Sequence, residues 1–81
     1  MASPKRSIIE VIQKMLNLIP LSETKLISEL TEYRNSLWNR APEVRDSAEC
    51  WIPLQNIMNS NIREIDMNWK IDIVHIFNRA Y

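Results

Sequence analysis

Apolar residues recur along this chain at the three-to-four-residue intervals of amphipathic helices, in four segments. Between residues 8 and 19, apolar positions cover about half of a helical wheel and polar positions cover the other half. The next two segments carry narrower apolar stripes with the same spacing. The pattern predicts helices over about residues 4–19, 22–40, 42–58 and 62–80.

The fourth segment fits two interpretations. Its apolar residues repeat at helical intervals: Ile62, Ile65, Trp69, Ile73, Ile76 and Ala80. Alternate positions from 69 to 77 are also apolar or aromatic, as in a strand. The strand pattern is incomplete, however, because Val74 and Ile76 would make its second face apolar as well. The helical pattern also covers more turns, so we predict a helix here.

The first helix has two candidate starts. Ser3 before Pro4 matches an N-cap followed by proline at the first helical position. Ser7 with Glu10 matches a capping box, which keeps the preceding basic residues out of the first turn. Pro20 ends the helix, because the residue before a proline is disfavoured in the α region.

Local signals also mark the later boundaries. Ser22 is a good N-cap, and Leu21 and Leu26 are expected to pack together as a hydrophobic staple. In the third segment Pro53 interrupts the pattern, because an interior proline removes a hydrogen bond and clashes with the preceding turn. We therefore predict that this helix is kinked or split at Pro53. The run of residues 59–61, Asn-Ser-Asn, predicts a loop.

The chain has 81 residues, no glycine and one cysteine, and 46% of its residues are hydrophobic. Short links without glycine favour antiparallel neighbours, so we predict an all-α fold: a small compact bundle of about four helices, with residues 1–81 as a single helical domain. A chain of this size has a thin core. A partner or a second copy is therefore expected to complete it.

Composition excludes several classes of protein. The 10 basic and 10 acidic residues give a net charge of zero, and the apolar content is too high for a disordered chain. The lone cysteine cannot form an internal disulfide, and no glycine-rich phosphate loop exists. No apolar run reaches the length of a membrane span. With no export signal recognised, we expect a cytoplasmic, intracellular protein.

The sequence offers little catalytic chemistry. Cys50 and His75 are the only residues of their kinds, and nothing in the pattern brings them together. Asp72 and His75 share a helix face, but a di-iron or zinc site needs further ligands. We therefore expect a protein that is not an enzyme and has no cofactor, no metal and no small-molecule substrate.

Tryptophan and arginine near one helix end give the candidate binding site. Trp38 lies off the main apolar stripe, at the end of the predicted second helix, and charged residues follow it. Trp and Arg are the side chains most enriched at binding hot spots. The predicted protein-binding residues are Trp38, Arg40, Glu43 and Arg45. The alternative is that Trp38 closes the end of the core.

These observations favour a protein–protein interaction module: an adaptor, an inhibitor or immunity-type partner, or the subunit of a small homo-oligomeric assembly. The alternative is a helix-turn-helix regulator that binds nucleic acid, drawn through residues 8–19 and 22–40. Glu23 and Glu29 stand where phosphates would approach, and the chain lacks a basic surface. The sequence therefore favours a protein partner or self-association over nucleic acid.

Overall fold

The computed structural model describes residues 7–62 and 67–80, and helices account for most of them. The helices are α1 (Ile8–Leu18), α2 (Thr24–Trp38), α3 (Pro42–Arg45), α4 (Ala48–Ile62) and α5 (Met67–Ala80). The all-α bundle predicted from the sequence is confirmed. No strand occurs within these two ranges, so the strand interpretation of residues 69–77 is wrong.

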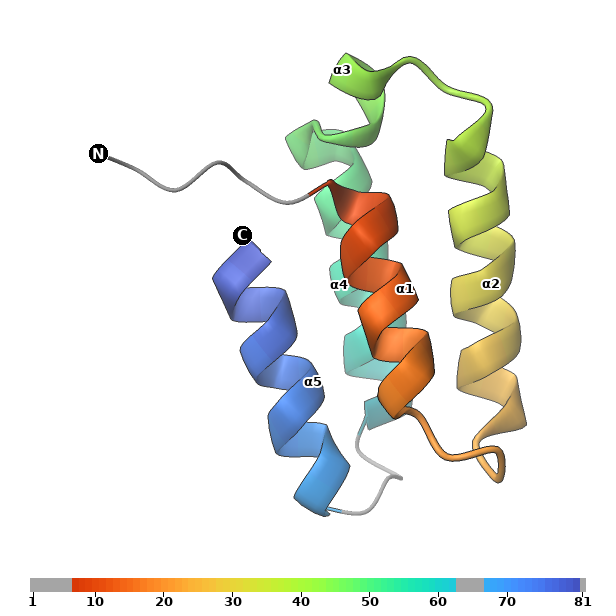
Figure 1. Ribbon diagram of the computed structural model, residues 1–81, viewed down its shortest axis with the longest axis vertical. Coiled ribbons are helices and arrows are strands. Elements are labelled where there is room, and N and C mark those ends of the chain that lie inside the picture. The colour runs from red at the N-terminus through yellow and green to blue at the C-terminus, as the bar shows by residue number, and fades with distance from the viewer. Residues whose placement is uncertain (1–6, 63–66, 81) are drawn as a thin grey trace.

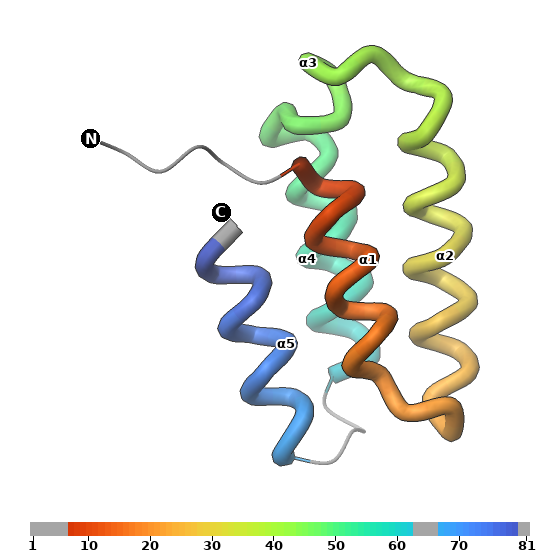
Figure 2. The backbone as a smooth tube through the Cα atoms, in the orientation of Figure 1, coloured from red at the N-terminus to blue at the C-terminus, as the bar shows by residue number. Residues whose placement is uncertain are grey.

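The four long helices run up and down in a flattened bundle of 33 × 30 × 19 Å (Figure 1). α1 lies in the middle and packs against α2 on one side and α5 on the other, while α4 lies behind α1 and packs against α2. Successive long helices are antiparallel, as the tube in Figure 2 shows. The short α3 joins α2 to α4 across one end of the bundle.

The core contains one row of side chains from each long helix. Its largest fully buried members are Ile8, Val11, Ile12, Met15, Leu26, Leu30, Leu37, Leu54 and Ile73. The stripes predicted for the first two helices are thus confirmed as core-facing. No polar or charged residue is buried within the described ranges. Burial of apolar surface is therefore the main force that holds the helices together.

The first helix begins at the second of its two candidate starts. The Ser7 side chain accepts a hydrogen bond from the Glu10 N–H at 3.2 Å. Asp46 adds an acceptor from far along the chain, because its Oδ1 lies 3.3 Å from the Ile8 nitrogen. These two oxygens satisfy N–H groups that a helix start leaves unpaired. The Ser3–Pro4 start lies outside the described residues.

The link between α1 and α2 differs from its prediction. The Glu23 N–H donates to the Pro20 carbonyl at 2.9 Å, which closes a turn over residues 20–23. α2 therefore begins at Thr24, after Ser22, and its N-cap Glu23 makes no side-chain capping bond. The turn points Leu21 outward, and its side chain is 88% exposed. The expected staple between Leu21 and the buried Leu26 does not form.

The break in the third predicted helix falls at residues 46–47, and α4 continues through Pro53. The Ser47 hydroxyl donates to the Val44 carbonyl at 2.7 Å, and the Ser47 N–H donates to the same oxygen at 3.2 Å. The Cys50 thiol donates to it as well, at 2.9 Å. These local bonds turn the chain between α3 and α4 and account for the break.

The loop predicted at residues 59–61 is wrong, because α4 extends to Ile62. The Ser60 hydroxyl donates to the Ile57 carbonyl, inside the helix. The Asn61 amide donates to the Ile57 carbonyl at 3.0 Å and to Glu29 Oε2 on α2 at 2.8 Å. These side chains bond to α4 itself or to a neighbouring helix, so they do not interrupt the helix.

Candidate protein-binding face

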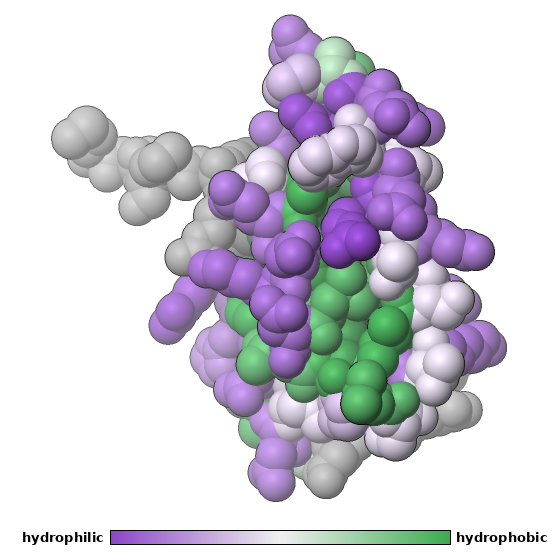
Figure 3. Space-filling view, turned by 45° about the vertical axis from the view of Figure 1, so that its right-hand side comes forward, coloured by the Kyte–Doolittle hydropathy of each residue, from purple (hydrophilic) through white to green (hydrophobic). Residues whose placement is uncertain are grey.

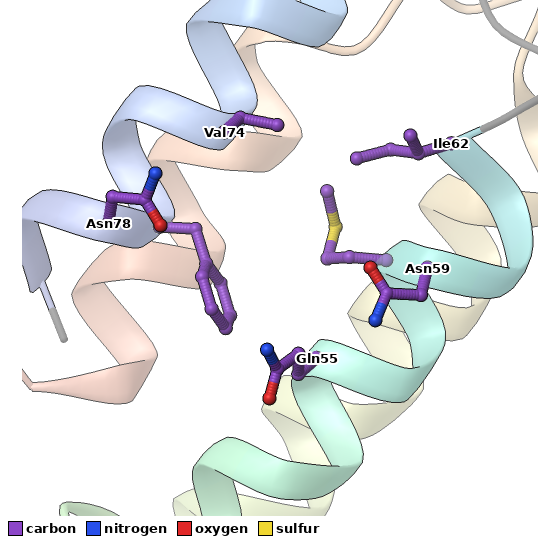
Figure 4. Close-up of a pocket in the computed structure, with 7 residues that line it drawn as sticks. Gln55, Asn59, Ile62, Val74 and Asn78 are labelled. Carbon is purple, nitrogen blue, oxygen red and sulfur yellow. The ribbon is translucent and has the colours of Figure 1, made fainter.

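A groove of about 140 Å³ separates α4 from α5. Its lining comprises Gln55, Met58, Asn59 and Ile62 of α4 and Val74, Phe77 and Asn78 of α5. Figure 4 shows the labelled side chains of the two helices on opposite sides of this gap, with Val74 facing Ile62. The groove is apolar at its centre, and amide side chains stand along it.

The groove exists because α4 and α5 pack mainly against other helices. α4 approaches α2 closely and α5 approaches α1 closely, whereas the backbones of α4 and α5 approach each other at few points. The Trp51 and Phe77 rings bridge the two helices edge to face, with their centroids 5.3 Å apart. Within the described residues, α4 and α5 therefore touch through these two rings, and the groove lies beside this contact.

Each helix carries a second stripe beside this groove, apart from its core stripe. On α4 the positions are Ala48, Ile52, Gln55, Asn59 and Ile62, and on α5 they are Met67, Ile71, Val74 and Asn78. Each set falls within an arc of less than about 90° on a helical wheel. We call these nine residues the α4–α5 face. Five of them are large and apolar, and three are amides.

The apolar side chains of this face are open to solvent. Ile52 is 57% exposed, Met67 65%, Ile71 50% and Val74 42%. They make up half of the large hydrophobic side chains that are exposed within the described residues. These exposed apolar side chains make the α4–α5 face a candidate interaction surface.

The α4–α5 face also lacks charge. None of its nine positions is charged, and Glu49 is the only charged residue in the whole of α4. Lys70 flanks the face on α5, half-buried. Depletion of charge at the centre, with charge left to the edge, is the compositional signature of protein interfaces.

The binding residues predicted from the sequence lie elsewhere, at the corner between α2 and α3. Trp38 is the last residue of α2 and is 66% exposed, so it does not close the core. Arg40 and Glu43 are exposed and Arg45 is half-buried. All four belong to one short stretch of chain, and their role in binding stays a prediction.

A part-buried hydrogen bond joins α2, before this corner, to the start of α4. The Tyr33 hydroxyl donates to the Cys50 carbonyl. Burial, followed by the neighbouring Cys50, raises the pKa of Tyr33 from 10.0 to about 12, and the Arg40 guanidinium opposes that rise. Tyr33 therefore stays protonated across the physiological range and acts as a structural donor.

The two residues with catalytic potential, Cys50 and His75, lie on different helices, α4 and α5. Cys50 is buried at the start of α4, with its thiol on the Val44 carbonyl. His75 is exposed and lines a shallow hollow of about 320 Å³ between α5 and α1, together with Asp72 and Arg79. Within the described residues, no group of three His, Cys, Asp or Glu side chains could hold a metal ion.

A further apolar band lies between α1 and α2. In Figure 3 this band runs between polar side chains and widens toward the end of the bundle where α1 joins α2. Leu21, in the link between the two helices, is an exposed large hydrophobic residue of that end, whereas Leu18 lies on the α5 side of α1. Because α1 and α2 pack closely along this band, it is the outer edge of the core and offers no groove between separated helices.

The sequence predicted no binding residue on the α4–α5 face, although the spacing of its residues contains a signal for that face. The positions of both stripes follow the intervals four, three, four along the chain. This is the heptad spacing of helices that pack side by side. On each helix the stronger core stripe masks the second stripe, because the two together make the helix look apolar over most of its circumference.

No helix within residues 7–62 and 67–80 is long and apolar enough to cross a membrane. No protein-family model, no curated protein and no solved structure matches this chain.

Proposed function

We propose that this chain is a protein-binding module that binds an apolar helical partner through the α4–α5 face. The observation that carries the proposal is the second, solvent-exposed stripe on both helices that border one groove. A helix with two apolar faces buries one in its own core and has the other available for a neighbour.

The dimensions of the groove favour a macromolecule over a small ligand. Small-molecule pockets have volumes of about 300–1,000 Å³ and enclose most of the ligand. The groove here is about 140 Å³ and lies between exposed side chains. It therefore suits side chains that project from a partner surface better than a whole substrate.

Charge and helix arrangement favour a protein over nucleic acid. Binding to nucleic acid relies on clustered cations at the phosphates, and the α4–α5 face carries none. In the helix-turn-helix alternative the two helices cross at about 90–120°. Here α1 and α2 lie side by side and antiparallel (Figure 1).

Affinity capture with surface variants tests this proposal. The tagged chain, incubated with lysate of its own organism with and without nuclease treatment, should retain a protein in stoichiometric amount in both cases. Ile71→Lys should abolish this capture, because it places a charge on the apolar α4–α5 face. Asn68→Lys is the matched control: it adds the same side chain at an exposed position of the same helix and should leave capture unchanged.

Two results would contradict the proposal. Retention of nuclease-sensitive material alone would support the helix-turn-helix alternative. Capture that survives Ile71→Lys and is lost with Trp38→Ala would move the binding surface to the corner between α2 and α3, where the sequence placed it.

A further inference from the structure

We infer that the partner is a second copy of this chain, and that two α4–α5 faces pack against each other around a two-fold axis. This inference rests on the proposed function. The resulting interface contains four helices, α4 and α5 from each protomer. Asn59 and Asn78 lie within it and set the alignment of the two faces.

The spacing of the face residues matches this arrangement. Helices that repeat contacts at alternating intervals of three and four pack nearly parallel or antiparallel to their neighbours. α4 and α5 both carry this spacing and are themselves antiparallel (Figure 2). They form one half of a four-helix arrangement, and an identical half completes it.

The width of the face favours a second copy over a single foreign helix. One helix with its side chains is about 10 Å across, and two side by side are about 20 Å across. A single helix in the groove would cover the residues along the centre line and leave the outer Ile52 and Ile71 exposed. A second pair of helices covers both stripes.

The side chains of the α4–α5 face can pack against an identical set of side chains. A two-fold contact brings a surface against an identical one, so a charge on it would need an opposite charge on the same surface as its partner. None of the nine face positions is charged. Gln55, Asn59 and Asn78 each carry an amide that both donates and accepts, so each can bond to a polar group of the second copy.

The asparagines give the interface its alignment. In packed helices with heptad spacing, a single asparagine among apolar residues fixes register and oligomeric state, and it lowers affinity. Each stripe here carries one asparagine, Asn59 on α4 and Asn78 on α5, and both line the groove. A shifted alignment would leave these amides against isoleucine or valine and without a partner.

The size of the face predicts the strength of the dimer. Helices of 15 and 14 residues are each about 20 Å long, so the pair presents roughly 400 Å² in projection. This belongs with the small interfaces, which bury less than about 600 Å² per partner. We therefore expect a reversible dimer with a dissociation constant in the micromolar range.

Sedimentation equilibrium of the purified full chain tests the inference, over concentrations from about 1 µM to about 500 µM, which bracket this class of affinity. The apparent mass should rise from the monomer value of 9.6 kDa to twice that value. Ile71→Lys on α5 and Ile52→Lys on α4 should each raise the dissociation constant at least about tenfold. The matched lysine controls, Asn68→Lys and Ser60→Lys, replace exposed side chains outside the face and should dimerise as the unmodified chain does.

A third variant tests the role of the asparagines. Asn78→Ile should lower the dissociation constant and produce species larger than a dimer, because the constraint on alignment is removed. Unchanged affinity and a uniform dimer would remove Asn78 from the interface. Far-UV circular dichroism and thermal melts of each variant at low concentration establish that it folds as the unmodified chain does.

The outcomes separate this inference from the proposed function. A chain that stays monomeric at every concentration overturns the second copy as partner. If Ile71→Lys then still abolishes capture of a different protein, the face binds that protein and the proposed function stands. If the chain dimerises and neither Ile71→Lys nor Ile52→Lys weakens the dimer, the two copies associate through another surface and the inference is wrong.

Discussion

At the scale of single residues, Tyr33 is the clearest example of a role that sequence patterns do not reveal. Its position on the apolar stripe of α2 predicted burial, and its ring does pack against the core. The bond from its hydroxyl to the Cys50 carbonyl depends on how α2 meets the start of α4. No periodicity within one helix carries that information.

Tyr33→Phe should lower the free energy of unfolding by about 1 kcal/mol at neutral pH, because a part-buried hydrogen bond is lost and the ring stays. The pKa of Tyr33 is raised in the folded state, from 10.0 to about 12. The folded chain therefore holds this proton more tightly than the unfolded chain does. The stabilisation is complete below pH 10 and declines as the pH rises toward 12.

Urea denaturation of both chains across this pH range measures the effect. The unmodified chain should be the more stable below pH 10, and the difference should shrink above it. Equal stability of the two chains at neutral pH would show that the hydroxyl contributes nothing to the fold.

For Trp38 the sequence left two interpretations open, a surface residue or one that closes the core. With its side chain 66% exposed, Trp38→Ala should change the free energy of unfolding by no more than about 0.5 kcal/mol, the usual range for surface substitutions. Thermal or urea denaturation checks this. A loss of several kcal/mol would mean that the indole packs into the core, as large-to-small core substitutions do.

At the scale of helices, periodicity predicted which residues pack inward, and local hydrogen bonds decided where helices start and stop. The Ser7 start could be read from Ser7 and Glu10 alone, because a capping box is local. The break at residues 46–47 depends on three groups that donate to one carbonyl, that of Val44. Pro53 gave the stronger sequence signal, yet α4 passes through it.

Pro53→Ala tests how α4 tolerates an interior proline. Proline has no N–H to donate to the Glu49 carbonyl, and its ring crowds the preceding turn. Alanine restores the donor, although it also gives the unfolded chain more freedom. We expect a net rise in the free energy of unfolding of about 1–2 kcal/mol. Lower stability of Pro53→Ala would indicate that the proline ring itself makes a needed contact.

The second apolar stripes of α4 and α5 also belong to the scale of helices. The sequence pattern did not reveal them for a different reason. A helix that is apolar on two sides gives a broad and weak pattern, and its core side dominates the interpretation. Separating the two sides requires knowing which neighbours α4 and α5 contact, namely α2 and α1. That information comes from the packing of the whole bundle.

At the scale of the whole molecule, the thin core and the exposed α4–α5 face both favour a partner that covers the face. Half of the large hydrophobic side chains exposed within the described residues lie on α4 and α5. Covering them with a second copy would stabilise the folded state by mass action. The sequence led us to expect a partner for the core, and the structure adds a candidate location for it.

If two α4–α5 faces pair, the stability of the fold and the affinity of the dimer depend on solution conditions in a defined way. The melting temperature should rise with protein concentration, because dimerisation favours the folded state. Salt should change the dimer affinity little, because the face has no charge to screen. A dissociation constant that climbs steeply with salt would instead point to an interface of charged residues elsewhere on the surface.

The most direct measurement of the central claim is a concentration series of amide NMR spectra on the isotope-labelled full chain. If two α4–α5 faces meet, resonances of Ile52, Gln55, Asn59, Ile71 and Val74 should shift progressively as the concentration rises. The exposed polar side of α1 should stay unchanged. Shifts confined to the corner around Trp38, or spectra that do not change with concentration, would contradict the claim that these faces meet.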